Sequence, residues 1–191
     1  MWRFLTLIYS FREPLTQQNV SHSTATGVSC SYSLVMRTIS LATAIIISER
    51  SRSTWWRRIA DGAVARVADD SKGRAVLRWE DVLPQVCVPL HEDDKAHLLR
   101  ADSGDAAAQG NMGQFFATHR KFEIAVYWLR QAAEQGDADA MQWLGSAYAA
   151  GSGVPQDDNL AIMWIAKAAA HGHVIALEQI RGMRRGANAV Q

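Results

Sequence analysis

The chain has 191 residues, with 20 basic and 19 acidic side chains and a net charge of +1. A nearly neutral chain has no long-range field to attract nucleic acid or an anionic membrane, so neither is the expected partner. The length fits one ordinary domain plus a tail. Cys30 and Cys87 lie far apart and outside any metal-ligand spacing, so we expect two free thiols, no metal and no cofactor.

Residues 1–53 differ in composition from the rest of the chain. They are rich in Ser and Thr, contain only Glu13 and Glu49 as acids, and show no sustained hydrophobic period. Such a segment cannot bury enough apolar surface to offset the entropy of ordering, which predicts a disordered tail. A Ser-rich, Arg-containing and acid-poor composition is also typical of organelle transit peptides. A third interpretation places the natural start at Met36, so that the early residues are not native.

Residues 41–47 form the most apolar run of this segment. They are too few to span a membrane, which takes about 20 residues. Read from Met36, the run has the basic start and short apolar core of a secretion signal, but no convincing cleavage site follows it. We therefore expect a cytoplasmic protein, with export as the alternative. Otherwise the run is a short strand, a short helix or an unstructured piece.

Residues 54–103 are expected to form a helical N-terminal cap. Apolar residues at four-residue spacing predict a helix over residues 55–68, and a second helix is expected over residues 92–101. Pro84 and Pro89 limit any helix within residues 75–88 to one or two turns. Residues 55–58 (Trp-Trp-Arg-Arg) resemble an interfacial membrane anchor. The shortness of the helix and its acidic residues favour a cover for the repeat core instead.

Residues 104–172 nearly repeat themselves. A shift of 32 positions places Gly104 and Asp105 on Gly136 and Asp137, and further along a shift of 36 places Trp128 on Trp164. The extra residues lie in one loop, near residues 151–157. Two near-copies of this length are typical of helical-hairpin repeats. We therefore predict an all-α fold, a short α-solenoid of antiparallel helix hairpins, with repeat units at residues 104–136 and 137–172 and a capping helix and tail at residues 173–191.

Each unit is expected to contain two helices. They are predicted over about residues 105–117 and 121–134 in the first unit, and 137–149 and 157–170 in the second. Gly104 and Gly136 suit helix ends, Asp105 and Asp137 suit caps of the first helix of each unit, and Asp157 or Asp158 is expected to cap the last helix. Gly110, inside a predicted helix, has no repeat counterpart, and the sequence does not explain it. The residues expected to build the repeats are Gly113, Phe116, Ala125, Trp128, Gly136, Ala140, Leu144, Gly145, Tyr148, Gly151, Gly153, Asp157, Ala161, Trp164, Ala168 and Gly172.

One motif makes the comparison with a known family specific. The motif is Ala140-x3-Leu144-Gly145-x2-Tyr148, then Gly151-x-Gly153-Val154-x2-Asp157-x3-Ala161-x2-Trp164-x2-Lys167-Ala168. It resembles the Sel-one-like repeat (SLR), a cousin of the tetratricopeptide repeat. The first unit departs from the pattern in lacking the Gly-x-Gly-Val loop and in having Gln131 for the family Lys. The half unit after Gly172 has Arg181 for the Gly. The resemblance implies a solenoid that binds other proteins and has no chemistry of its own.

The expected function is therefore a non-catalytic scaffold or adaptor that binds another protein or peptide in the solenoid groove. The candidate partner-binding residues lie opposite the core side of the first helix of each unit: Asn111, Gln114, Asp139, Gln142, Trp143 and Ser146. Trp143 is the expected anchor, because Trp dominates interface hot spots, unless it packs on a neighbouring helix. Roughly three units are needed for a stable stack. Self-association through an open end is thus an alternative to capping by the flanking helices.

Catalytic motifs are not recognisable in the sequence. His171 and His173 have no acidic or sulfur ligand at a useful spacing, and we expect solvated loop histidines. The Gly-Ser-Gly at residues 151–153 lacks the Lys-Ser/Thr of a phosphate loop. We expect no enzyme activity. The alternative is an enzyme or a small-ligand-binding protein with a site in residues 54–100.

Overall fold

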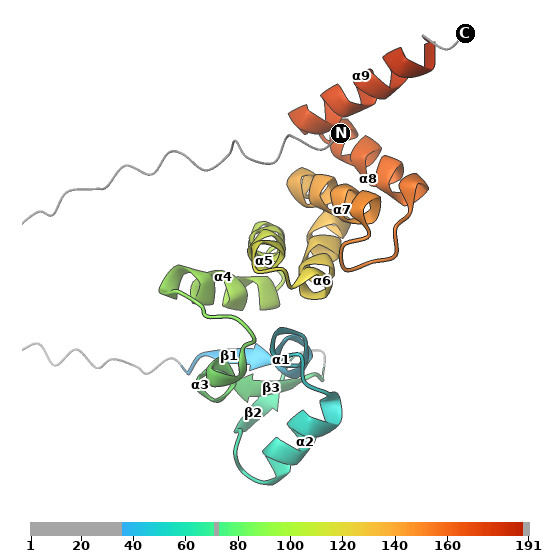
Figure 1. Ribbon diagram of the computed structural model, residues 1–191. Coiled ribbons are helices and arrows are strands. Elements are labelled where there is room, and N and C mark those ends of the chain that lie inside the picture. Colours follow the sequence, from blue (N-terminus) through green and yellow to red (C-terminus); the bar gives the residue numbers. More distant parts are fainter. Residues whose placement is uncertain (1–35, 71–72, 189–191) are drawn as a thin grey trace, which may run out of the picture. The chain divides into compact units, whose positions relative to one another are not determined.

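The structure is a computed structural model that describes residues 36–70 and 73–188 (Figure 1). The first part of the expected disordered tail, residues 1–35, lies outside the described residues. Residues 36–53 differ from the expectation, because strand β1 (Thr38–Ser40), helix α1 (Leu41–Ser48) and the start of helix α2 (Arg52–Ala60) are folded there. The apolar run at residues 41–47 is α1. Its Ala44 and Ile47 are fully buried, so the run belongs to the protein core.

A small sheet was not predicted. Strands β1, β2 (Arg66–Asp69) and β3 (Ala75–Arg78) pair antiparallel in the order β1-β3-β2. The helix expected over residues 55–68 ends at Ala60, because Gly62 adopts a left-handed φ of 73° and the chain turns into β2. The protein is mostly helical, as predicted, but its N-terminal part is not the purely helical cap that we expected.

Short helices connect the sheet to the repeats. Helix α3 (Trp79–Val82) leads into a single 3-10 turn, η1 (Leu83–Gln85), and α4 (Glu92–Asp102) follows. The first repeat shares one hydrophobic core with this N-terminal part, so the two form one packed body. The largest fully buried side chains of this core are Trp55, Trp79, Trp128, Phe116, Ile39, Ile47, Leu77 and Leu98.

Asp102, at the end of α4, joins the helices to the start of α1. Its carboxylate accepts hydrogen bonds from the Ser40 backbone N–H (2.8 Å), the Ser40 hydroxyl (2.6 Å) and the Thr43 hydroxyl (2.5 Å). Ser40 and Thr43 are 4% and 2% exposed. Buried hydroxyl groups are stable only when they have partners, so Asp102 is a structural acceptor.

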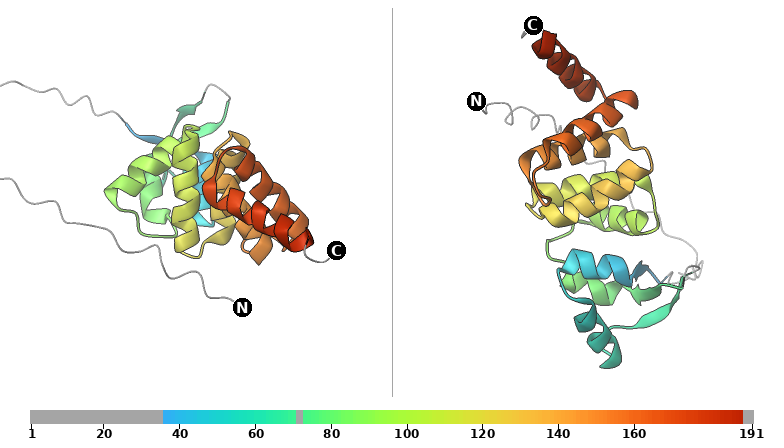
Figure 2. Two further views of the ribbon diagram at one scale, coloured as in Figure 1. Left: turned by 90° about the horizontal axis from the view of Figure 1, so that it is seen from above. Right: turned by 90° about the vertical axis from the view of Figure 1, so that its right-hand side faces the viewer.

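The two repeats form the helix pairs that the sequence predicts. They consist of α5 (Ala106–Thr118) with α6 (Phe122–Glu134), and α7 (Ala138–Ala150) with α8 (Asp158–Ala170), and α9 (Val174–Asn188) follows. Figure 2 shows the helices stacked in chain order. The carboxylates of Asp105, Asp137 and Asp157 each accept a backbone N–H from the first turn of the following helix, as expected for N-caps.

Repeat glycines allow the two helices of each pair to lie close together. A Cβ atom at Gly113 would lie 2.5 Å from Leu129 Cγ, and one at Gly145 would lie 2.7 Å from Ile165 Cγ1. Such distances require glycine unless the facing helix moves. The corresponding position on α9 is Arg181, whose guanidinium pairs instead with Glu178 of the same helix at 2.5 Å. Helix α9 therefore presents an arginine where both complete repeats present a glycine.

The longer loop of the second repeat reaches back to the first. Gly153 has a φ of 74°, and a Cβ atom there would overlap the Phe122 carbonyl and lie 2.8 Å from the backbone N of Glu123. The loop thus lies against the first residues of α6. The first repeat makes its turn without this loop, and Arg120 takes the left-handed conformation there, with a φ of 60°.

The residues expected to build the repeats occupy the interior or the turns. Buried are Gly113, Phe116, Ala125, Trp128, Ala140, Leu144, Gly145, Ala161 and Ala168. Tyr148 and Trp164 are half-buried and pack against the core of the second repeat. Gly104, Gly136, Gly151 and Gly172 have positive φ at the turns, as expected for helix ends.

Candidate functional site

The candidate partner-binding residues lie on the first helix of each repeat, α5 and α7. Asn111 and Trp143 occupy the same repeat position, and Gln114 and Ser146 occupy another. Asn111, Trp143 and Ser146 are exposed and Gln114 is half-buried. The Trp143 side chain is 41% exposed, so packing on a neighbouring helix covers only part of it. These four residues define what we call the α5–α7 surface.

The other two candidates are engaged with α9. Gln142 is 8% exposed, and its Nε2 donates to Gln179 Oε1 at 3.0 Å. Asp139 is exposed, and its Oδ1 lies 3.3 Å from His173 Nε2. Both side chains therefore help to join α7 to α9. We leave Gln142 out of the candidate surface, because a buried amide has no access to a partner.

Two histidines begin helices, and one of them, His173, was expected in a solvated loop. His173 Nδ1 accepts the backbone N–H of Ala176 at 3.2 Å in the first turn of α9, while its Nε2 faces Asp139. His91 begins α4 in a reciprocal capping box with Asp94, whose carboxylate accepts the His91 backbone N–H at 3.0 Å. Their roles are thus structural. The sequence signal for this cap is Asp94, an acidic residue three positions after His91 at the start of the predicted helix.

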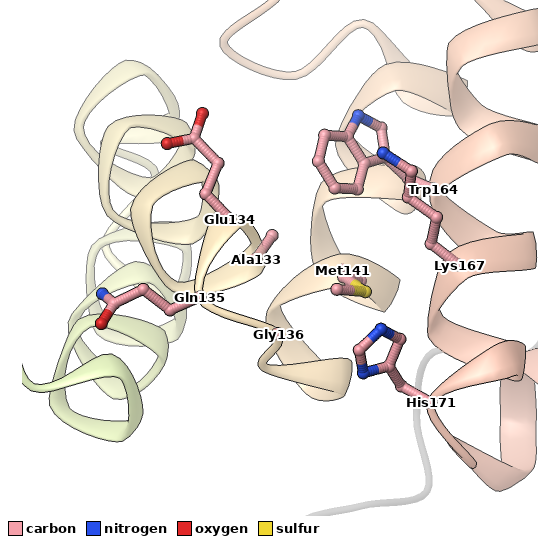
Figure 3. Close-up of a pocket in the computed structure, with 8 residues that line it drawn as sticks. All are labelled: Ala133, Glu134, Gln135, Gly136, Met141, Trp164, Lys167 and His171. Atoms are coloured by element: carbon pink, nitrogen blue, oxygen red, sulfur yellow. The ribbon is translucent and has the colours of Figure 1, made fainter.

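An open pocket of about 530 Å³ lies between the end of α6 and helices α7 and α8 (Figure 3). Trp164, Lys167 and His171 line it from α8 and the turn that follows, and Glu134 and Gln135 line the opposite side. The Lys167 ammonium lies 4.4 Å from the centre of the Trp164 ring, a cation-π geometry. The sequence assigned Trp164 to the core. Its side chain is half-buried because one side faces this pocket.

The pKa shifts of Asp105 and Cys87 follow from a helix cap and from burial. The Ala108 backbone N–H and the Arg100 guanidinium hold the pKa of Asp105 below its usual range, which favours the charged cap. Burial raises the pKa of the Cys87 thiol, and the nearby Glu49 carboxylate raises it further. A raised pKa disfavours the thiolate, the opposite of what a nucleophilic cysteine needs.

Within residues 36–70 and 73–188, no three His, Cys, Asp or Glu side chains are grouped so that they could hold a metal ion. In the same described ranges, none of the helices combines the length and apolar character needed to cross a bilayer.

The fold places the chain among the α-solenoid proteins built from helix hairpins, with α5–α6 and α7–α8 as two hairpins and α9 as a further helix. The Sel1 repeat family matches residues 106–137 and 138–173. Residues 106–173 are therefore two Sel1 repeats, in agreement with the resemblance seen in the sequence.

Solved structures similar to part of the chain include two repeat proteins. One is a Sel1 repeat protein from Oxalobacter formigenes, with 34% identity and a TM-score of 0.42 over 46% of this chain and 26% of that chain. The other is a protective antigen of uropathogenic Escherichia coli strains that displays an SLR fold. It has 33% identity and a TM-score of 0.39 over 41% of this chain and 18% of that chain. The chain thus spans about a quarter or less of the length of these relatives.

Proposed function

We propose that the chain is a non-catalytic adaptor that binds another protein or peptide on the α5–α7 surface, with Trp143 as the anchor. Sel1 repeats usually mediate protein interactions, which supports a protein partner. The exposure of Trp143 carries the proposal. Trp128 is 1% exposed in the core, whereas Trp143 leaves 41% of its surface open. Ser146, one turn further along α7, and Asn111, at the equivalent position of α5, are exposed as well. Tryptophan is enriched at the energetic centres of protein interfaces.

The N-terminal part serves in this proposal as a rigid support. Its core is continuous with that of the first repeat, and the Lys121 ammonium pairs with Glu49 at 2.7 Å to join α6 to the end of α1. The alternative expected from sequence was an enzyme or small-ligand site in residues 54–100. In that segment Trp55 and Trp79 are fully buried in the core, and the pocket described above is lined by residues 133–171 instead. We therefore propose the adaptor alone.

Affinity purification with wild-type protein and two tryptophan variants tests the proposal. Trp143→Ala removes the anchor, and Trp56→Ala is a matched control, since Trp56 is 40% exposed but lies on α2, outside the repeats. A hot-spot Trp contributes about 2 kcal/mol or more, so a partner should bind Trp143→Ala about 30-fold more weakly. Circular dichroism and melting curves establish that both variants fold. Equal recovery of the same partner by all three proteins would exclude Trp143 as the anchor.

A further inference from the structure

Helix α2 has one buried side and one exposed side, and the exposed side combines cations with a tryptophan. Trp55 is fully buried, while Ile59 and Arg58 are half-buried beside it. The remaining directions of the helix are exposed and carry Arg52, Ser53, Trp56, Arg57 and Ala60. In a helix of 3.6 residues per turn, Arg52 and Arg57 lie on either side of Trp56. We call this set the α2 basic face.

The arginines of the α2 basic face have no acidic partners among the described residues. Arginines elsewhere do: Arg74 pairs with Asp70 and Arg78 with Asp81. In contrast, no described carboxylate lies within ion-pair distance of Arg50, Arg52 or Arg57, all of which are exposed. Within the described ranges, no ion pair therefore neutralises these three charges.

The neighbouring strand extends this face. The Arg66 guanidinium, which also pairs with Asp69, lies 5.6 Å from the centre of the Trp56 ring. Val67, next in the strand, is 43% exposed. Asp61 follows α2 directly and is exposed, which reduces the positive charge but does not cancel it. Figures 1 and 2 place α2 at the end of the described part that lies opposite α9, where the repeats do not obstruct it.

We propose that the α2 basic face binds an anionic lipid surface and so holds the protein at a membrane as a peripheral protein. Trp with arginine on both sides is the combination that occupies the headgroup level of a bilayer. The face is the outer side of a nine-residue helix, with small Ser53 and Ala60 between the longer side chains, so it can lie along a plane. The net charge of +1 gave no reason to expect attraction to an anionic membrane. A cluster of arginines on one helix can nevertheless attract anionic lipids at short range.

Sedimentation of the full chain with vesicles tests the proposal. Vesicles of phosphatidylcholine alone are compared with vesicles that also contain phosphatidylglycerol, at low and at physiological salt. The double variant Arg52→Gln/Arg57→Gln removes two charges from the face. The double variant Arg184→Gln/Arg185→Gln, on exposed positions of α9, removes the same charge elsewhere and is the matched control. Each arginine near an anionic leaflet contributes about 1 kcal/mol, so the first variant should bind about 30-fold more weakly.

The expected result is binding to the anionic vesicles only, weakened by salt, lost in the α2 variant and kept in the α9 variant. Trp56→Ala should also weaken binding, by a smaller factor. Equal loss in both double variants would show a general charge effect and overturn the proposal. So would a wild type that does not sediment with anionic vesicles. Tighter binding to polyglutamate or to nucleic acid than to the vesicles, at equal salt, would assign the face to another partner. Protein recovery through Trp143 is measured without lipid, so the two proposals fail independently.

Discussion

Replacing Gly153 by alanine should destabilise the protein more than the same change at other glycines with positive φ. Two costs add at this position. An alanine at a φ of 74° is strained by about 1 kcal/mol. Its Cβ would also lie 2.8 Å from the backbone N of Glu123, and real Cβ atoms stay beyond 3.0 Å, so the loop must move away from the start of α6. Overpacking against backbone costs about 1–3 kcal/mol. Gly153→Ala should therefore lower the free energy of unfolding by about 2–4 kcal/mol.

Gly172→Ala is the matched control for this prediction. Gly172 has a φ of 87°, but no atom lies within 4 Å of the position that its Cβ would occupy. This variant should lose only the strain term, about 1 kcal/mol. Urea unfolding followed by circular dichroism measures both variants under the same conditions. If Gly153→Ala is no less stable than Gly172→Ala, the loop does not press on α6 and the contact between the repeats at this point is not as described.

Two further variants test the N-terminal part. Asp102→Ala leaves the buried hydroxyls of Ser40 and Thr43 without their acceptor, so the free energy of unfolding in urea should fall by about 2–3 kcal/mol. A loss below about 0.5 kcal/mol, typical of surface changes, would show that Asp102 does not join α4 to α1. Asp81→Ala tests a pH dependence. The hydrogen bond from Arg78 lowers the pKa of Asp81 below 3.8, so its stabilisation is present above about pH 4 and is lost as the pH falls through the lowered pKa. The stability difference between wild type and Asp81→Ala should shrink on acidification, and a difference that grows would contradict this assignment.

The repeats could be predicted from sequence because their signals are local. Asp137 and Asp157 cap the helices that begin immediately after them, and Gly136 ends α6 with a positive φ, as the sequence pattern indicates. The predicted and observed helix limits therefore differ by about one residue. The interpretation of Trp164 was less complete, because periodicity places a residue on the core side but does not show how far neighbouring helices cover it.

Gly110 shows why other features escaped prediction. A Cβ atom there would lie 3.3 Å from the Asp137 carboxylate, so the glycine leaves room for the cap of α7. The two residues are far apart in sequence, and only the stacking of the repeats brings them together. The sheet escaped for a related reason. Its strands have three or four residues each, too few for alternation to be recognised, and β1 pairs with β3 across a long intervening segment.

The arginine on α9 has a consequence for engineering longer arrays. A helix added directly after α9 to complete its hairpin would pack against Arg181, where Gly113 and Gly145 allow close contact in the natural pairs. Copies of residues 138–173 are therefore better inserted between α8 and α9, so that every added unit keeps its glycine. Extension beyond α9 would first require Arg181→Gly.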